Sequence, residues 1–153
     1  REGLELTLAS IANDVDYDKI RIAKEKPEHV QFVFTNLVDT DSLFGHRRDA
    51  KGYNVALTEI DQWLGKILGA MTNDDLLIIS SDHGNDPTAP GTDHTREFVP
   101  LLAYSPSFES VSEMNVGIRD GFTDVAASVA DWVGTKWEGP GVSFVSGVRA
   151  AAV

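Results

Sequence analysis

Residues 76–87 read LLIISSDHGNDP, a short apolar run that passes at once into a polar loop. A run of this length, bounded by turn residues and a polar segment, is typical of a buried β-strand. Residues 73–75 (NDD) precede the run and predict a turn. The sequence therefore predicts a strand over residues 76–80 that delivers Asp82 and His83 into the loop behind it.

Two further strands are predicted on either side of this segment. Residues 30–38 (VQFVFTNLV) form a nearly continuous β-branched and aromatic run. That pattern predicts a strand buried on both faces. Residues 99–104 (VPLLAY) predict a third strand, which ends before Ser105 and Pro106.

Helices are predicted between and after the strands. Residues 52–71 carry an apolar stripe at helical spacing, formed by Tyr53, Leu57, Ile60, Leu64, Ile67, Leu68 and Met71. Residues 122–133 predict a second helix, with Thr123 or Asp124 near its N-cap. Alternating strands and helices predict an α/β fold with a largely parallel sheet flanked by helices. Residues 4–12 follow a helical period loosely, and the start at Arg1 suggests that further sequence precedes it.

Composition limits the classes of partner and of chemistry. The formal net charge of -11 argues against nucleic acid or an anionic membrane as a partner. No run reaches the roughly 18 apolar residues of a membrane span, and the N-terminus has no apolar signal segment, so a cytoplasmic location is expected. Without cysteine, a metal site must use histidine and carboxylate ligands.

Such ligands gather in the two polar loops that follow predicted strands. In open α/β sheets, ligands bind beyond the carboxyl ends of the strands. Mixed imidazole and carboxylate ligands suit Mn, Zn or Fe better than Mg or Ca. The first loop, residues 39–49, carries Asp39, Asp41, His46, Arg47 and Arg48, and the second carries Asp82, His83, Asp86, Asp93, His94, Arg96 and Glu97.

Each candidate also has a simpler interpretation. A single histidine in a polar loop is usually a solvated surface residue, and Asp82 or Asp93 could serve only a local turn. The adjacent Gly45 and Gly84 favour a site, because a residue without a side chain would let the backbone bend and bring His46 and His83 inward.

At this point the motifs carry a resemblance. Residues 36–49 (NLVDTDSLFGHRRD), 81–87 (SDHGNDP) and 91–97 (GTDHTRE) resemble the C-terminal motifs of the phosphopentomutase family, within the alkaline phosphatase superfamily. The likeness extends from about Leu4 to Phe144. It implies that residues 1–153 are the C-terminal part of an alkaline phosphatase-like metal-binding core domain, without the N-terminal core segment and the cap domain.

The resemblance also implies a cofactor, ligands and a reaction. Two manganese ions are expected, one held by Asp82 and His83, the other by Asp41, His46 and His94. The family interconverts ribose or deoxyribose 1-phosphate and the 5-phosphate through a phosphorylated threonine. Such cations would also offset the strongly negative charge of the chain.

What the resemblance leaves out bears on activity. The nucleophilic threonine and a further metal-binding aspartate are expected upstream, in the missing N-terminal part of the enzyme, so no catalytic nucleophile is assigned to Thr92 or Thr95. This chain alone is therefore expected to be inactive. Arg47, Arg48 and Arg96 are candidates for contact with phosphate or with the metal-binding carboxylates, and surface salt links are the alternative.

Two other functions stay open at this point. Another phosphomutase or phosphatase of the alkaline phosphatase superfamily, such as a cofactor-independent phosphoglycerate mutase, would use similar Asp and His clusters. The second alternative is a non-catalytic, truncated metal-binding domain. A pentose phosphate is the expected substrate, and neither nucleic acid nor a membrane is an expected partner.

Overall fold

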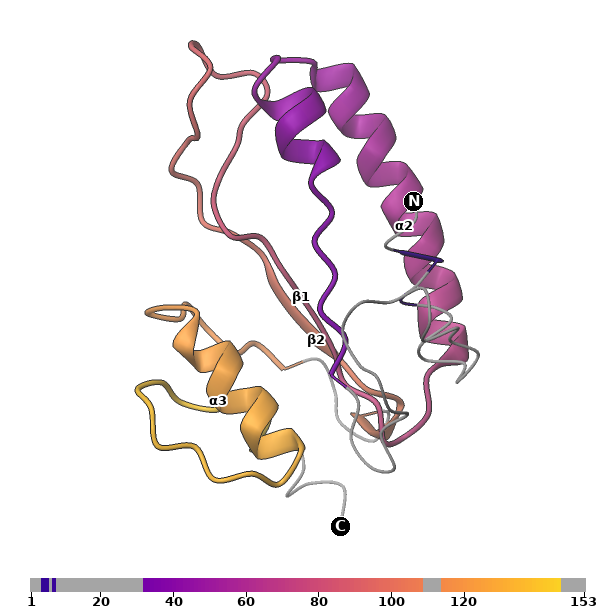
Figure 1. Cartoon of the computed structure of the whole chain (residues 1–153), viewed down its shortest axis with the longest axis vertical. Helices are drawn as coiled ribbons and strands as arrows, with labels where there is room; N and C mark the ends of the chain where they lie inside the picture. The colour runs from indigo at the N-terminus through magenta and orange to yellow at the C-terminus, as the bar shows by residue number, and fades with distance from the viewer. Residues whose placement is uncertain (1–3, 6, 8–31, 109–113, 147–153) are drawn as a thin grey trace, which may run out of the picture. The chain divides into compact units, whose positions relative to one another are not determined.

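The computed structural model describes residues 4, 5, 7, 32–108 and 114–146 of the chain (Figure 1). The backbone divides into two compact units, Arg1–Met71 with Ser80–Leu101, and Thr72–Ile79 with Leu102–Val153. The elements in chain order are η1 (Thr40–Gly45), α2 (Ala50–Ala70), β1 (Leu77–Ser80), β2 (Leu101–Tyr104), η2 (Pro106–Phe108) and α3 (Thr123–Trp132). Of the predicted opening helix, residues 4, 5 and 7 are helical, and the others lie outside the described residues.

The long amphipathic helix is confirmed as α2. It begins after Asp49, whose carboxylate accepts a hydrogen bond of 2.9 Å from the Gly52 amide and so caps the first turn. Ile67 is fully buried on its inner stripe. The stripe is narrower than predicted, because Leu57 and Leu68 are exposed. Among the described residues, no helix is both long and apolar enough to span a membrane.

The strands predicted over residues 76–80 and 99–104 are confirmed as β1 and β2. They pair with each other in an antiparallel two-stranded sheet (Figure 1). This is the one sheet among the described residues, so the largely parallel sheet expected from the sequence is not confirmed. A strand needs a hydrogen-bonded neighbour, and the hydrophobic pattern of a segment does not say which neighbour it has.

The strand predicted over residues 30–38 is wrong for the residues that the structure describes. Residues 32–37 form no β-ladder, and the Phe32 and Phe34 side chains are 68% and 78% exposed. The apolar run predicted burial on both faces, which only flanking segments can supply. Within the described residues, no segment supplies it. Residues 39–49, predicted as a polar loop, instead form η1 and the turn that leads into α2.

The second unit is built around α3. Its helix begins at Thr123 and places Asp124 in the first turn, close to the predicted start. Thr123 and Asp124 thus lie near the N-cap as predicted, and the N-cap residue itself is Phe122, whose side chain makes no capping hydrogen bond. Ala127 and Trp132 form its buried face, and the Trp132 ring meets Phe108 edge-on at 5.9 Å between centroids.

Buried polar side chains fasten α3 to the segment that follows it. The Ser128 hydroxyl donates to the Asp124 carbonyl and accepts from the Phe144 amide at 2.9 Å. The Asp124 carboxylate accepts from the Val142 amide at 2.8 Å and from the Arg119 guanidinium at 2.6 Å. These partners offset the cost of burying Asp124 and hold the chain against the helix.

Asp124 makes the stability of this unit depend on pH. The hydrogen bond from Val142, opposed by burial and aided by the hydrogen bond and charge of Arg119, lowers the pKa of the Asp124 carboxyl group. A lowered folded-state pKa stabilises the fold above the unfolded pKa, and that contribution is lost as the pH falls through the folded pKa.

Replacing Asp124 with asparagine is therefore expected to destabilise the protein at pH 7 and to leave it closer to the wild type near pH 3. Urea midpoints measured across this range would show the narrowing difference. Asp120→Asn is the matched control, because Asp120 is exposed and the substitution removes the same negative charge. A difference between Asp124→Asn and the wild type that is constant with pH would contradict the role of the Asp124 charge.

Candidate metal centre

The winding of η1 brings two predicted ligands to the same side. Asp41 and His46 are five residues apart. In an α-helix, five residues advance about 140° beyond a full turn, which would place the two side chains on different faces. In η1 the His46 amide bonds instead to the Asp41 carbonyl at 3.0 Å, which is the i→i+5 pattern of a π-helix. The extra residue in the turn places the two side chains one above the other.

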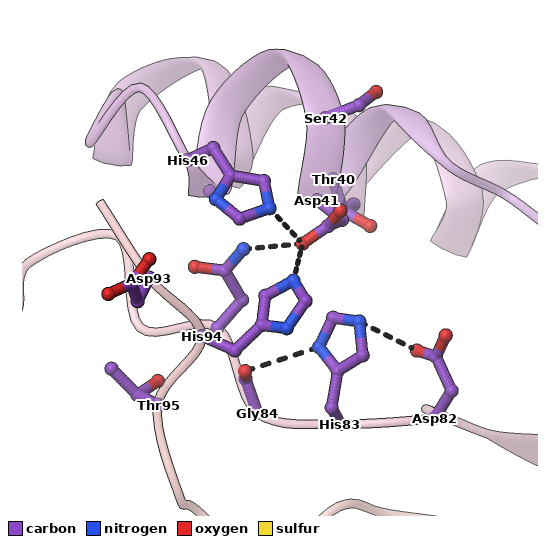
Figure 2. A network of polar contacts seen from close by, with 12 residues as sticks. Thr40, Asp41, Ser42, His46, Asp82, His83, Gly84, Asp93, His94 and Thr95 are labelled. Carbon is purple, nitrogen blue, oxygen red and sulfur yellow. Dashed lines mark hydrogen bonds and ion pairs between the residues drawn. The ribbon is translucent and has the colours of Figure 1, made fainter.

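The Asp41 carboxylate is the centre of the cluster (Figure 2). Its Oδ1 atom lies 3.5 Å from His46 Nε2 and 3.3 Å from His94 Nε2, and it accepts a hydrogen bond of 2.6 Å from Asn85 Nδ2. Ligand atoms of Asp41, His46 and His94 all lie within 4.8 Å of one another. The structure therefore brings together all three residues assigned to the second manganese ion.

A backbone bridge delivers His94 to this cluster. Gly84 and Thr95 form an antiparallel bridge, in which the Thr95 amide donates to the Gly84 carbonyl at 3.1 Å. The neighbouring histidines, His83 and His94, consequently stack with 3.6 Å between ring centroids and 21° between planes. The two predicted sets of metal ligands are thus adjacent in space.

Hydrogen bonding fixes which nitrogen of His46 faces Asp41. The Nδ1 atom contacts the Thr92 carbonyl oxygen at 2.5 Å, and because a carbonyl can only accept, Nδ1 carries the proton. In the neutral ring, Nε2 then presents a lone pair toward the carboxylate. Two acceptors facing each other at 3.5 Å require a cation or a proton between them.

The charges around Asp41 favour its ionised form. Burial alone would raise the pKa of this carboxyl group. The hydrogen bond from Asn85 and the charges of His46, His94 and His83 outweigh burial and lower that pKa. Asp41 is therefore an anion at neutral pH, as a carboxylate ligand must be.

The donor set fits a divalent transition metal. Two ligand atoms that each lie about 2.1 Å from a tetrahedral ion are roughly 3.4 Å apart. The separations of 3.3 Å and 3.5 Å from Asp41 to the two histidine nitrogens match that spacing. The side chains of Asp41, His46 and His94 are 34%, 39% and 44% exposed, so an ion held there would also face an entering ligand.

The other predicted pair forms a less complete group. His83 Nε2 lies 3.6 Å from Asp82 Oδ1, and the Asp82 side chain is 77% exposed. Among the described residues, no third acidic or histidine side chain joins this pair. The pair alone offers an ion two ligands, which is consistent with the expectation that further ligands come from elsewhere.

The three arginines separate clearly. Arg47 and Arg96 are exposed, whereas Arg48 is half-buried and its guanidinium group donates to the Asn85 side chain and to several main-chain carbonyls. Sequence reasoning did not single out Asn85, although it touches Asp41. Its position directly after Asp82-His83-Gly84 is the one feature of the sequence that could have identified Asn85 as part of the site.

Gly45 and Gly84, beside His46 and His83, were predicted to let the backbone bend, but the structure gives them another role. Neither Gly45 nor Gly84 has a positive φ. A Cβ atom on Gly45 would lie 2.6 Å from Asn85 Cγ, and one on Gly84 would lie 2.8 Å from the Thr95 carbonyl. Gly84 is required because the backbone at Thr95 approaches too closely for a side chain, whereas Gly45 leaves the space that the Asn85 side chain occupies.

Neither Thr92 nor Thr95 gains a nucleophilic role. The Thr95 hydroxyl accepts from the Asp86 amide at 2.7 Å and donates to the Glu97 carboxylate. Asp86 accepts from the amide and the hydroxyl of Thr88, and so serves a local turn. Thr92 contributes its main-chain carbonyl to His46. These contacts are structural.

Comparison with known families agrees with this geometry. Residues 3–137 match the family model described as the metalloenzyme superfamily. Because the match covers most of the chain, this chain belongs to the metalloenzyme superfamily.

More specific similarity is found to named enzymes. The chain is 49% identical to the phosphopentomutase of Deinococcus radiodurans over 142 residues, which are 92% of this chain and 36% of that protein. It is 50% identical to the phosphopentomutase of Syntrophotalea carbinolica over 130 residues, which are 85% of this chain and 32% of that protein. The resemblance stated from the motifs is confirmed. The chain spans about a third of the length of these relatives.

Proposed function

We propose that this chain is the metal-binding part of a phosphopentomutase, which interconverts ribose or deoxyribose 1-phosphate and the 5-phosphate through a phosphothreonine. The observation that carries the proposal is the convergence of Asp41, His46 and His94 in a chain about 50% identical to phosphopentomutases. Two manganese ions, a pentose phosphate substrate and a cytoplasmic location are parts of the same proposal.

The residues have distinct tasks in the proposed site. Asp41, His46 and His94 would hold one ion, and Asp82 with His83 would hold the other. Divalent ions bound there would neutralise phosphate charge and steady the attacking and leaving oxygens. The Thr92 carbonyl keeps the proton on His46 Nδ1, so that Nε2 stays available as a ligand. The Asn85 amide orients the Asp41 carboxylate.

The chain alone is proposed to be inactive. The Thr95 hydroxyl is engaged with Asp86 and Glu97, and the resemblance assigns the nucleophilic threonine to the part of the relatives that this chain does not span. Asp82 and His83 also lack a third ligand among the described residues.

A chimera tests the proposal directly. The segment of the Deinococcus phosphopentomutase that matches this chain would be replaced by this chain, and conversion of ribose 1-phosphate would be measured with Mn²⁺. Turnover by the chimera, with none by the isolated chain, is the expected result. Parallel assays with phosphoglycerate and a simple phosphomonoester test the other superfamily activities. A folded chimera that binds Mn²⁺ and converts no pentose phosphate would refute the proposal.

A further inference from the structure

Arg48 adopts an unusual backbone conformation directly after the π-helix. Its φ of 55° lies in the left-handed region, and it is the one residue other than glycine with a positive φ in the described part of the chain. This conformation is unfavourable for a residue with a Cβ atom. Where such a conformation persists, the surrounding contacts must stabilise it.

Those contacts are made by the guanidinium group, and they use all three of its nitrogens. The acceptors belong to both loops of the metal centre. They are the carbonyl oxygens of Gly91 (2.5 Å from Nε), Asp93 (2.7 Å from Nη2), Asp86 (2.7 Å from Nη1) and Gly45 (3.3 Å from Nη1), with Asn85 Oδ1 at 3.1 Å from Nη1.

Two of these acceptors belong to residues directly adjacent to a candidate ligand. Gly45 directly precedes His46, and Asp93 directly precedes His94. A single planar group therefore ties together the backbone segments that carry both histidines. The fork of an arginine can bridge several acceptors in fixed directions, which the ammonium group of a lysine cannot do.

The contact with Asn85 extends the same control to the carboxylate. Arg48 donates to Asn85 Oδ1, which directs the other end of the amide, Nδ2, toward Asp41 Oδ1 at 2.6 Å. The absence of a side chain at Gly45 leaves the room that Asn85 occupies. Arg48 thus acts on Asp41 through Asn85.

We propose that Arg48 is a positioning residue that assembles the Asp41, His46 and His94 centre before any metal binds. Its donors are already directed at five protein acceptors. The part that concerns metal rests on the proposed function, whereas the ordering of the loops does not. Substituting a residue that hydrogen-bonds to a metal ligand typically weakens metal binding by about 10- to 100-fold.

The test combines a metal-free and a metal-bound measurement on Arg48→Lys, which keeps the charge and loses the planar fork. Hydrogen exchange of the amides in residues 85–95 is measured without metal, and Mn²⁺ affinity is measured by calorimetry. We expect faster exchange and at least roughly 10-fold weaker Mn²⁺ binding. Arg47→Lys is the matched control, because the neighbouring Arg47 is exposed, and we expect it to change neither quantity.

The outcomes separate this inference from the proposed function. Exchange and affinity that both equal the wild-type values would overturn the role of Arg48. If the wild type binds no Mn²⁺, the metal proposal fails, and the exchange measurement alone decides whether Arg48 orders the loops. If Arg48→Lys does not fold, Asn85→Ala replaces it, since that change leaves the four carbonyl contacts in place. Weaker Mn²⁺ binding by Asn85→Ala supports the relay, and unchanged binding overturns it.

Discussion

Replacing Asp41 with asparagine is expected to weaken Mn²⁺ binding by at least about 100-fold. Loss of a residue that only hydrogen-bonds to a metal ligand weakens metal binding by up to about 100-fold, and loss of a ligand should cost at least as much. In the described part of the chain, Asp41 is the one carboxylate that lies close to both His46 and His94. Asparagine keeps the size of the side chain and removes the negative charge. Calorimetric titration of the metal-free protein with Mn²⁺ measures the effect.

Asp93→Asn is the control for this experiment. It removes the same charge one residue before His94, and Figure 2 shows the Asp93 side chain apart from the contacts that converge on Asp41. Its carbonyl, which Arg48 contacts, is unchanged by the substitution. We expect Asp93→Asn to bind Mn²⁺ within a few-fold of the wild type. Equal binding by the two variants would show that Asp41 is not a ligand and that only the overall charge matters.

Replacing Trp132 with alanine is expected to destabilise the second unit by about 3–5 kcal/mol, the usual cost of truncating a buried aromatic side chain. The Trp132 side chain is buried against Phe108, and its indole nitrogen donates to the Asp74 carbonyl at 3.1 Å. A small domain is stable by roughly 5–15 kcal/mol in total. Urea unfolding followed by circular dichroism measures the loss without relying on tryptophan fluorescence.

Trp137 provides a matched control for Trp132. Its indole nitrogen also donates to a carbonyl, that of Pro140 at 3.0 Å, but its side chain is 41% exposed. We expect Trp137→Ala to cost within about 1 kcal/mol, as exposed substitutions usually do. Similar losses for both variants would contradict the assignment of Trp132 to the core.

The helices α2 and α3 and the two short strands could be predicted from the sequence because their signals are local. The apolar stripe of α2 and the apolar runs of β1 and β2 depend only on the order of apolar and polar residues within one segment. The apolar pattern of residues 32–38, by contrast, predicts a strand only if other segments cover both of its faces. Phe32 and Phe34 remain exposed because, within the described residues, no segment packs against them.

The proximity of Asp41, His46 and His94 could be predicted from the sequence, but the contacts that support these three residues could not. Asp41, His46 and His94 belong to a recognisable motif, so their convergence could be anticipated. The role of Arg48 could not, because four of its five acceptors are main-chain carbonyls, which every residue type possesses. Side-chain identity carries no trace of such contacts.

The π-helix makes the centre sensitive to the length of the chain. Ser42 and Leu43, between Asp41 and His46, are exposed, so their replacement leaves the donors where they are. Inserting one residue between them would keep every donor in the sequence and turn His46 away from Asp41, because the i→i+5 bond of the π-helix would then no longer join the two ligand positions. In another chain, one extra residue at this place would therefore mark a lost centre more surely than several substitutions.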